Sequence, residues 1–288
     1  MRVLDGRATA KAIKEEIAEE VQEMVAKGMT RPHLAAVLVG DDPASQTYVG
    51  AKVKACEQVG FKSSLVELPN ETSEEDLLKK VEELNRQDDL HGFIVQLPLP
   101  DHIDGQKVLE AIDPSKDVDG FHPVNVGKMV LGLPCFLPAT PYGILQLLER
   151  NDIKTTGKHC VVIGRSHIVG SPMSILLARN AEPGNCTVTL AHSRTQNIED
   201  LTRQADIIIA AVGRKHFVTA DMVKPGAVVV DVGIHRIPDD SKKRGYRLIG
   251  DVDYEQVSDK VEAISPVPGG VGPMTIVSLL KNTLQAAQ

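Results

Sequence analysis

The residue with the clearest capacity for chemistry in the first half of the chain is a lysine on an apolar helical face. On a helical wheel Lys52 shares one arc with apolar residues and with Tyr48, which lies one turn earlier. An amine in a partly dry cleft has a lowered pKa and can act in proton transfer. The alternative is a lysine whose stem covers the core while its ammonium stays in water.

Gln96 is the candidate for the polar partner that such a lysine needs. It ends the apolar run 92–96, which predicts a buried strand, and the prolines at 98 and 100 stop that strand. Ligands of open α/β sheets bind beyond the carboxyl ends of the strands, where Gln96 would lie. A side chain satisfied by loop backbone is the other interpretation of Gln96.

Asp119 lies in the stretch 113–138, which has little periodicity and many turn residues. A long irregular stretch in a compact protein is more often functional than idle. An Asp before Gly commonly bends a turn through its own backbone. A carboxylate at this place could equally bind the amino-pyrimidine edge of a ligand through paired hydrogen bonds. The sequence leaves both interpretations of Asp119 open.

A glycine turn in the second half is typical of a phosphate site. Gly164 follows the apolar run 160–163, and Gly170 precedes a helical pattern over 171–180. Such a strand–turn–helix aims backbone N–H groups at a phosphate. The pattern GxGxxG is broken, however, because Ser166 and Val169 occupy two glycine positions. A turn without any ligand is therefore the alternative.

The residues after the next strand, 187–191, indicate which dinucleotide would bind. A site for NAD usually carries Asp or Glu there, whereas this chain has His192, Ser193 and Arg194. A hydroxyl and a guanidinium suit a ribose phosphate, so the sequence favours NADP, with Arg165 as a possible second cation. An ordinary polar loop is the alternative.

Strands and helices alternate along the chain, which is typical of parallel α/β sheets. We expect strands over 33–39, 61–68 and 92–96, then over 160–163, 187–191, 206–211, 227–232 and 248–251. Helices are expected over 9–27, 44–59, from 73, over 140–150, 171–180 and 198–203, and up to 287. The helix over 140–150 would join two domains.

Composition excludes several classes of protein. A length of 288 residues predicts two domains. The net charge of −7, without a basic cluster, argues against nucleic-acid binding. The four cysteines lack ligand spacing, which predicts reduced thiols and no metal site. Neither a signal peptide nor a membrane span is evident, so we expect a cytoplasmic protein, or one of an organelle matrix after loss of a leader, without a membrane partner.

Isolated histidines and late glycines complete the candidates. His192, His216 and His235 have no Ser or Asp at a triad spacing, so we expect them in loops or at the surface. Gly213 and Gly233 follow predicted strands, where a glycine indicates positive φ or close backbone approach beside a cofactor.

Five motifs occur in one order along nearly the whole chain, and together they closely resemble one enzyme family. They are Tyr48-Val49-x-x-Lys52, Val95-Gln96-Leu97-Pro98-Leu99-Pro100, Asp117-Val118-Asp119-Gly120-Phe121-His122-Pro123, Gly164-Arg165-Ser166-x-Ile168-Val169-Gly170-x-Pro172 and Pro266-Val267-Pro268-Gly269-Gly270-Val271-Gly272-Pro273-Met274-Thr275. The family is that of bifunctional methylenetetrahydrofolate dehydrogenase/methenyltetrahydrofolate cyclohydrolase (FolD).

The resemblance implies two α/β domains flanking a cleft, the second of them Rossmann-like. Residues 1–138 with 273–288 would form the catalytic, folate-binding domain, and residues 139–272 the NADP-binding domain. The implied protein is a homodimer in one-carbon metabolism and purine biosynthesis. It would oxidise 5,10-methylenetetrahydrofolate with NADP and hydrolyse the methenyl product to 10-formyltetrahydrofolate. A monofunctional dehydrogenase and an inactive folate- or NADP-binding protein are the alternatives, which Lys52, Gln96 and Asp119 disfavour.

The resemblance also implies roles for individual residues. Lys52 would assist hydrolysis with Gln96 tuning it, Tyr48 would stack on the aminobenzoate ring, and Asp119 would hold the pterin. These four residues and Pro98, Pro268, Gly269 and Gly270 would contact the substrate. The implied cofactor contacts are Gly164, Arg165, Ser166, Ile168, Val169, His192, Ser193, Arg194, Ala211, Val212, Gly213, Gly233, Ile234 and Thr275. In one departure, Ala139 replaces a cysteine usual in the family, and we expect activity to survive it.

Overall fold

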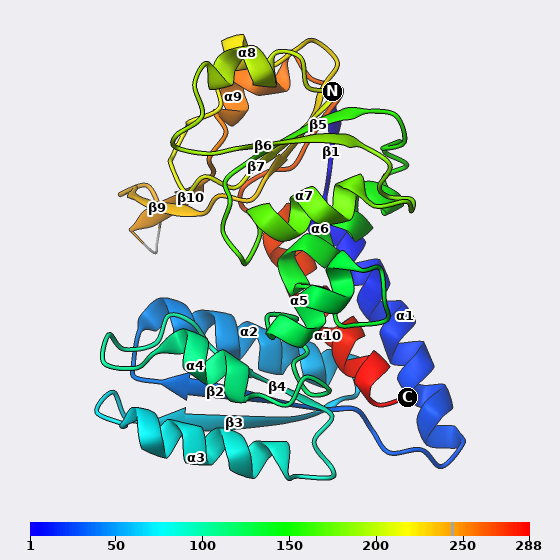
Figure 1. The fold of residues 1–288 in the computed structure, drawn as a ribbon, viewed down its shortest axis with the longest axis vertical. Coiled ribbons are helices and arrows are strands. Elements are labelled where there is room, and N and C mark those ends of the chain that lie inside the picture. The colour runs from blue at the N-terminus through cyan, green and yellow to red at the C-terminus, as the bar shows by residue number, and fades with distance from the viewer. Residues whose placement is uncertain (243–244) are drawn as a thin grey trace. The chain divides into compact units, whose positions relative to one another are not determined.

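The computed structural model describes residues 1–242 and 245–288, which form two compact units (Figure 1). The three-stranded unit comprises Lys11–Ala139 and Ile276–Gln288, and the six-stranded unit comprises Met1–Ala10 and Thr140–Thr275. The first ten residues thus group with the six-stranded unit instead of with the segment that follows them. The reason is that β1 (Arg2–Val3) pairs in parallel with β11 (Ala263–Ile264).

The sheet of the three-stranded unit has the order β3-β2-β4, and its strands are parallel. Every residue of the central strand β2 (His33–Val39) is buried, because it lies between β3 (Lys62–Leu68) and β4 (Gly92–Val95). This burial of an apolar run is typical of parallel sheets covered by helices. The helices that belong to this unit wholly or in large part are α1 (Gly6–Ala26), α2 (Pro43–Val59), α3 (Glu74–Asn85), α4 (Gly105–Ala111), α5 (Pro123–Val130) and α10 (Val271–Ala286).

Helix α2 has clear start and stop signals, which fix the position of the residues along it. Asp42 Oδ2 accepts a hydrogen bond from the backbone N–H of Ser45 at 2.7 Å, and Pro43 occupies the first turn. Gly60 ends the helix with φ of 79°, a left-handed conformation that favours glycine. The predicted helix over 44–59 is therefore confirmed, and Lys52 lies near its middle.

The expectation that 113–138 is irregular is wrong in part, because α5 lies within it. Pro123 opens the helix, and His122 Nδ1 accepts a hydrogen bond from the backbone N–H of Val124 at 3.1 Å. Eight residues complete only about two turns, which is too short for a periodic apolar pattern to stand out. Helix α4 was not predicted for the same reason.

The sheet of the six-stranded unit has the order β1-β11-β8-β7-β5-β6, with every neighbouring pair parallel. The chain runs from β5 (His159–Ile163) outward to β6 (Thr187–Ala191) and then back to β7 (Ile207–Ala210) and β8 (Val228–Asp231). The strand order therefore reverses between β5 and β7. In doubly wound sheets ligands bind beyond the carboxyl ends of the strands at such a switch point.

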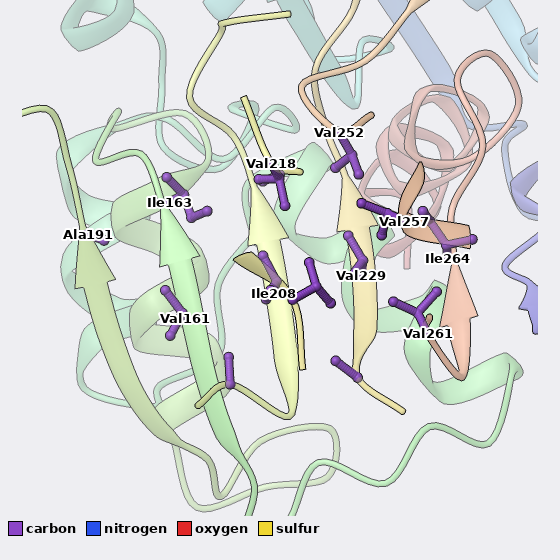
Figure 2. Packing of buried hydrophobic residues seen from close by; sticks show 14 residues of the cluster. Val161, Ile163, Ala191, Ile208, Val218, Val229, Val252, Val257, Val261 and Ile264 are labelled. Carbon is purple, nitrogen blue, oxygen red and sulfur yellow. The ribbon is translucent and has the colours of Figure 1, made fainter. Parts of the chain in front are cut away.

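The predicted parallel α/β class is confirmed, with one antiparallel addition. Strands β9 (His235–Pro238) and β10 (Tyr246–Ile249) form a hairpin, of which the sequence predicted only part of the second strand. The core of the unit consists of small and β-branched residues, which come from the main sheet and from the segments packed against it (Figure 2). The remaining helices are α6 (Ala139–Arg150), α7 (Gly170–Ala178), α8 (Ile198–Thr202), the 3₁₀ turn η1 (Ala220–Met222) and α9 (Tyr254–Ser258).

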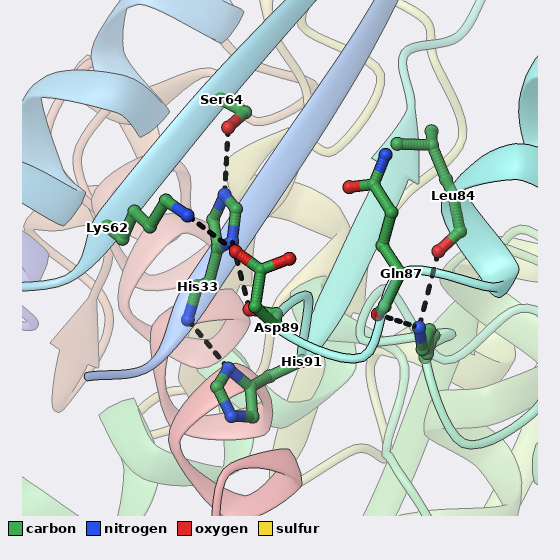
Figure 3. A network of polar contacts seen from close by, with 8 residues as sticks. His33, Lys62, Ser64, Leu84, Gln87, Asp89 and His91 are labelled. Atoms are coloured by element: carbon green, nitrogen blue, oxygen red, sulfur yellow. Dashed lines mark hydrogen bonds and ion pairs between the residues drawn. The ribbon is translucent and has the colours of Figure 1, made fainter. Parts of the chain in front are cut away.

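A polar network stands at the amino ends of the three-stranded sheet (Figure 3). His33 is 3% exposed, and its ring nitrogens lie 2.8 Å from Ser64 Oγ and 3.0 Å from the carbonyl oxygen of Asp89. The His33 backbone N–H donates to His91 Nδ1 at 3.0 Å, and Lys62 Nζ pairs with Asp89 at 2.5 Å. Burial lowers the pKa of His33, against the opposing effect of Asp89.

This lowered pKa predicts a loss of stability in acid. Folding favours neutral His33, so its contribution is present above the unfolded value of about 6.5 and is lost as the pH falls from there through the folded pKa. We expect the urea midpoint, followed by circular dichroism, to fall below about pH 6.5. The fall should be smaller in His33→Gln, although burial also lowers the pKa of His91. Equal pH slopes for the parent and the variant would contradict this prediction.

Candidate functional site

The structure brings Lys52 and Gln96 together as predicted. Lys52 Nζ donates a hydrogen bond to Gln96 Oε1 at 3.1 Å, from α2 to the residue that follows β4. The backbone N–H of Gln96 donates to Val37 O at 2.9 Å, and its Nε2 donates to Leu97 O at 2.5 Å. Because the backbone N–H and the side-chain Nε2 of Gln96 are both hydrogen-bonded, its amide oxygen is directed at Lys52.

Asp119 supplies the charge that acts on this pair. Burial lowers the pKa of Lys52, while the negative charge of Asp119 opposes that shift. Burial likewise raises the pKa of the Asp119 carboxyl, and the positive charge of Lys52 opposes it. Both residues are partly exposed overall, but their charged groups are surrounded by protein atoms, and the resulting desolvation causes both pKa shifts. The lysine therefore has a larger neutral fraction near neutral pH than a solvated lysine.

Asp117, and not Asp119, bends the loop that carries both residues. Asp117 is 1% exposed, and its carboxylate accepts hydrogen bonds from the N–H groups of Phe121 and His122 at 3.2 and 2.8 Å and from Asn125 Nδ2 at 2.9 Å. In the part of the chain that the structure describes, no group donates a hydrogen bond to the Asp119 carboxylate. Asp119 is thus available to a ligand.

Two further residues hold this loop in place. Asn282, on α10, donates from Nδ2 to Val118 O at 2.8 Å and to Leu137 O at 2.9 Å. The backbone N–H of Ala139 donates to Asp119 O at 3.2 Å. Ala139, which the resemblance to the family identified as a replacement for cysteine, makes this bond through its backbone, so the bond does not need a thiol. Asn282 gave no signal in the sequence, because it is remote from the loop.

The other predicted substrate contacts fall in both units. Tyr48 is 43% exposed one turn before Lys52, and Pro98 is exposed after the cis Leu97–Pro98 bond. The predicted turn at Pro268, Gly269 and Gly270 belongs to the six-stranded unit, where Gly269 has φ of 114° and accepts a hydrogen bond from the backbone N–H of Arg7 at 3.1 Å.

The glycine turn after β5 is built by close backbone contacts. Gly164 has φ of 115°, and a Cβ there would lie 2.0 Å from Ala211 O. A Cβ at Gly170 would lie 1.9 Å from Gly164 O. Ser166 Oγ accepts hydrogen bonds from the N–H groups of Val169 and Gly170 at 3.1 and 3.5 Å. The serine therefore holds the turn that precedes α7, which explains how the broken glycine pattern forms a tight turn.

The turns after β5 and β6 lie on adjacent strand ends, because Ile163 pairs with Ala191. Arg165, Ser193 and Arg194 are exposed there. His192 shapes its own turn: its Nδ1 accepts a hydrogen bond from the Arg194 N–H at 3.2 Å and its N–H donates to Thr195 Oγ1 at 2.9 Å. Of the remaining predicted contacts, Ile168 is 42% exposed and Thr275 Oγ1 lies 3.0 Å from Thr140 Oγ1.

The expectation that the isolated histidines lie in loops or at the surface is confirmed for His192 and His216, whereas His235 is the first residue of β9. Two of the three have an acidic neighbour that is distant in sequence. His235 Nε2 lies 2.8 Å from Asp251 Oδ1, and His216 Nδ1 lies 3.9 Å from Asp253 Oδ2. Asp231 is a further buried acid, which was not predicted. It is 4% exposed, and burial raises its pKa to about 7 against the opposing effect of three backbone N–H donors. The only local sign of these acids in the sequence was a nearby glycine: Gly233 lies two residues after Asp231, and Gly250 directly precedes Asp251.

Within residues 1–242 and 245–288, no group of three or more His, Cys, Asp or Glu side chains could hold a metal ion. None of the helices described is long and apolar enough to span a membrane.

Comparison with known proteins identifies the family. Residues 4–119 match the model of the tetrahydrofolate dehydrogenase/cyclohydrolase catalytic domain, and residues 138–288 match the model of its NAD(P)-binding domain. The chain belongs to this family. It is 68% identical over 287 residues to the bifunctional protein FolD of Cytophaga hutchinsonii, with 100% of this chain and 99% of that protein covered. It is 63% identical over 288 residues to the bifunctional protein FolD of Flavobacterium psychrophilum, with 100% of this chain and 98% of that protein covered.

Solved structures of the family agree with this assignment. The bifunctional enzyme FolD of Campylobacter jejuni superimposes with a TM-score of 0.93 at 49% identity, covering 100% of this chain and 98% of that one. The Trypanosoma brucei dehydrogenase-cyclohydrolase, solved with NADP and an inhibitor, has a TM-score of 0.93 at 41% identity, with coverage of 99% and 96%.

The electrostatics of the site predict the effect of Asp119→Asn. Because the Asp119 charge raises the pKa of Lys52, its removal should lower that pKa further. The pKa of Lys52 can be followed by nitrogen NMR of labelled lysine. Asp88→Asn, an exposed change in the same unit, serves as the control and should leave the Lys52 titration unchanged. A Lys52 pKa that rises or stays constant in Asp119→Asn would refute the coupling.

Proposed function

We propose that the protein oxidises 5,10-methylenetetrahydrofolate to 5,10-methenyltetrahydrofolate with NADP and then hydrolyses the product to 10-formyltetrahydrofolate. The observation that carries this proposal is the hydrogen bond from Lys52 Nζ to Gln96 Oε1, under the charge of Asp119. These three residues occur in a chain that is 68% identical to a bifunctional FolD protein. A monofunctional dehydrogenase would not need a lysine held in this way.

The first step requires that the folate be held while a hydride leaves its bridging carbon. NADP, when bound, accepts that hydride. The Asp119 carboxylate has no protein donor among the described residues, so it can accept hydrogen bonds from the amino-pyrimidine edge of the pterin. The exposed ring of Tyr48 stacks on the aminobenzoate group. Pro98, Pro268, Gly269 and Gly270 make the remaining substrate contacts in this proposal.

The second step adds water to the methenyl carbon. The water oxygen forms a bond to that carbon and one of its protons is released. The remaining hydroxyl proton passes to N5 as the bond from the carbon to N5 breaks, which leaves a formyl group on N10. Lys52 in its neutral form takes the proton from the attacking water, and burial favours that form because it lowers the pKa of the amine. Gln96 Oε1 orients Nζ for this transfer.

The six-stranded unit supplies the NADP site in this proposal. The backbone contacts of Gly164 and Gly170 leave no room for side chains, which suits a pyrophosphate beside the start of α7. No acid follows β6, and the exposed Ser193 and Arg194 suit the ribose phosphate. Ile168, Val169, Ala211, Val212, Gly213, Gly233, Ile234 and Thr275 complete the proposed contacts.

The family resemblance also leads us to propose a cytoplasmic homodimer that serves one-carbon metabolism and purine biosynthesis. Sedimentation equilibrium would measure the mass in solution and so decide between monomer and dimer.

The bifunctional proposal predicts separable effects of Lys52→Met. Purified protein with methylenetetrahydrofolate and NADP should give a methenyl signal that then decays. Lys52→Met should lower the rate of hydrolysis at least ~100-fold, because a general base is removed, while methenyl formation persists. Lys54→Met, an exposed neighbour on α2, is the matched control. Undiminished hydrolysis in Lys52→Met would remove Lys52 from the mechanism, and no methenyl with either nicotinamide cofactor would refute the enzyme proposal.

The choice of NADP predicts a selective effect of Arg194→Ala. Loss of a charge-assisted hydrogen bond should weaken NADP binding about tenfold to 100-fold and leave NAD binding nearly unchanged. Isothermal titration of both dinucleotides, with Arg165→Ala in parallel, identifies the arginine that holds the phosphate. Arg203→Ala is the control, because Arg203 pairs with Asp200 on α8. Equal losses for NADP and NAD in both the Arg194 and Arg165 variants would exclude these two residues from the phosphate site.

A further inference from the structure

One buried carboxylate joins two loops at the carboxyl edge of the six-stranded sheet. Asp251 is 0% exposed, and its Oδ2 accepts hydrogen bonds from the backbone N–H groups of Val212 and Gly213 at 2.8 and 2.9 Å. Its Oδ1 lies 2.8 Å from Nε2 of His235. Val212 follows β7 and His235 begins β9, so Asp251 binds segments that are separate in sequence.

A second buried carboxylate holds Asp251 itself. Asp231 Oδ1 accepts hydrogen bonds from the N–H groups of Asp251 and Gly233 at 2.9 and 3.0 Å, and its Oδ2 accepts one from Val252 at 3.0 Å. A Cβ at Gly233 would lie 2.4 Å from Asp251 Cγ, and a Cβ at Gly250 would lie 1.8 Å from Asp231 Oδ2. The two carboxylates and the loops around them therefore have one packed arrangement.

The loops held in this way are those proposed to meet the cofactor. Ala210 pairs with Asp231 at the ends of β7 and β8, so residues 211–213 and 233–234 emerge side by side. The Val232 N–H also donates to Ala210 O at 2.9 Å. The first of these loops touches the glycine turn, since a Cβ at Gly164 would meet Ala211 O. A shift of Val212 or Gly213 would therefore act directly on the dinucleotide surface.

The carboxylate is needed for this geometry. A buried charge is tolerated only when it is fully paired, and buried N–H groups without an acceptor are costly. Every oxygen of Asp251 has a partner, and Val212 and Gly213 depend on it for theirs. His235 is partly exposed, with 23% of its side chain accessible, and it orients the carboxylate from the solvent side. His235 and Asp251 thus resemble metal sites in which a second residue, outside the ligands, orients a ligand side chain through a hydrogen bond.

We propose that Asp251, oriented by His235, is a positioning residue that fixes the backbone of Val212 and Gly213 and thereby sets the affinity for NADP. This inference rests on the proposed function, because it assumes that the dinucleotide contacts these loops. It assigns a role to residues that do not themselves touch the substrate.

The proposal is tested by the steady-state kinetics of the full-length protein with methylenetetrahydrofolate and NADP. Asp251→Ala removes the acceptor for both N–H groups and should raise the KM for NADP at least about tenfold, which corresponds to ~1.4 kcal/mol. The KM for the folate should stay within about twofold, which a general structural defect would not allow. Asp251→Asn keeps one acceptor oxygen and a group that can meet His235 in its other tautomer, so it should restore most of the NADP affinity.

A second variant keeps the test informative if Asp251→Ala does not fold. His235→Phe preserves a ring of similar size and removes only the bond to Oδ1, and we expect the KM for NADP to rise about threefold to tenfold. Asp259→Ala, an exposed carboxylate of the same unit, is the control and should match the parent.

The outcomes separate this inference from the proposed function. If the parent forms no methenyl product, the proposed function fails. If the parent is active and folded Asp251→Ala or His235→Phe keeps the parent KM for NADP, the positioning role of Asp251 is refuted. Equal increases in the KM for NADP and for the folate would also refute it, because they would indicate a general structural defect.

Discussion

Backbone N–H groups in the loops beyond parallel strands need acceptors, and this requirement governs both units of the protein. Inside a strand the ladder satisfies each N–H, but the ladder ends where a functional site begins. Here buried carboxylates supply the missing acceptors. Asp117 does so in the three-stranded unit, and Asp231 and Asp251 do so in the six-stranded unit. Each binds several donors at once, which offsets the cost of burying the acid.

This use of acids divides the carboxylates into two kinds. The carboxylate oxygens of Asp117 accept hydrogen bonds from the loop, and the residue is almost fully buried. Asp119, two residues later, has a carboxylate that accepts no hydrogen bond from a protein donor among the described residues. The first shapes the backbone and the second is left for a ligand. A sequence shows both as Asp in a turn, so only the hydrogen bonds distinguish the residue that builds the site from the residue proposed to act in it.

Much of the fold could be predicted because apolar runs and caps are local signals. The strands over 33–39 and 187–191 have the bounds predicted from their apolar runs, and α2 begins and ends at its capping residues. The short helix α5 and the hairpin of β9 and β10 were missed in whole or in part, because short or half-exposed elements carry little periodicity.

The candidate site shows the same division between local and distant signals. Helical spacing placed Lys52 on the apolar face of α2, and the end of a strand indicated Gln96; the two do form a hydrogen bond. His235 and Asp251 are 16 residues apart in a region without regular spacing, and nothing local predicts that they meet. The family motifs supplied the roles of residues, whereas the hydrogen bonds show how the backbone around those residues is held.

The hydrogen bond from Asn282 to Val118 affects the order in which parts of the chain can fold during synthesis. The two residues are 164 positions apart. During synthesis, β2, β3 and β4 emerge close together and can pair early, because their loops are short to close. The segment around Asp119 gains this support only when α10 has left the ribosome. The Asp119 carboxylate is therefore among the last parts of its unit to be fixed, although it is made long before Asn282.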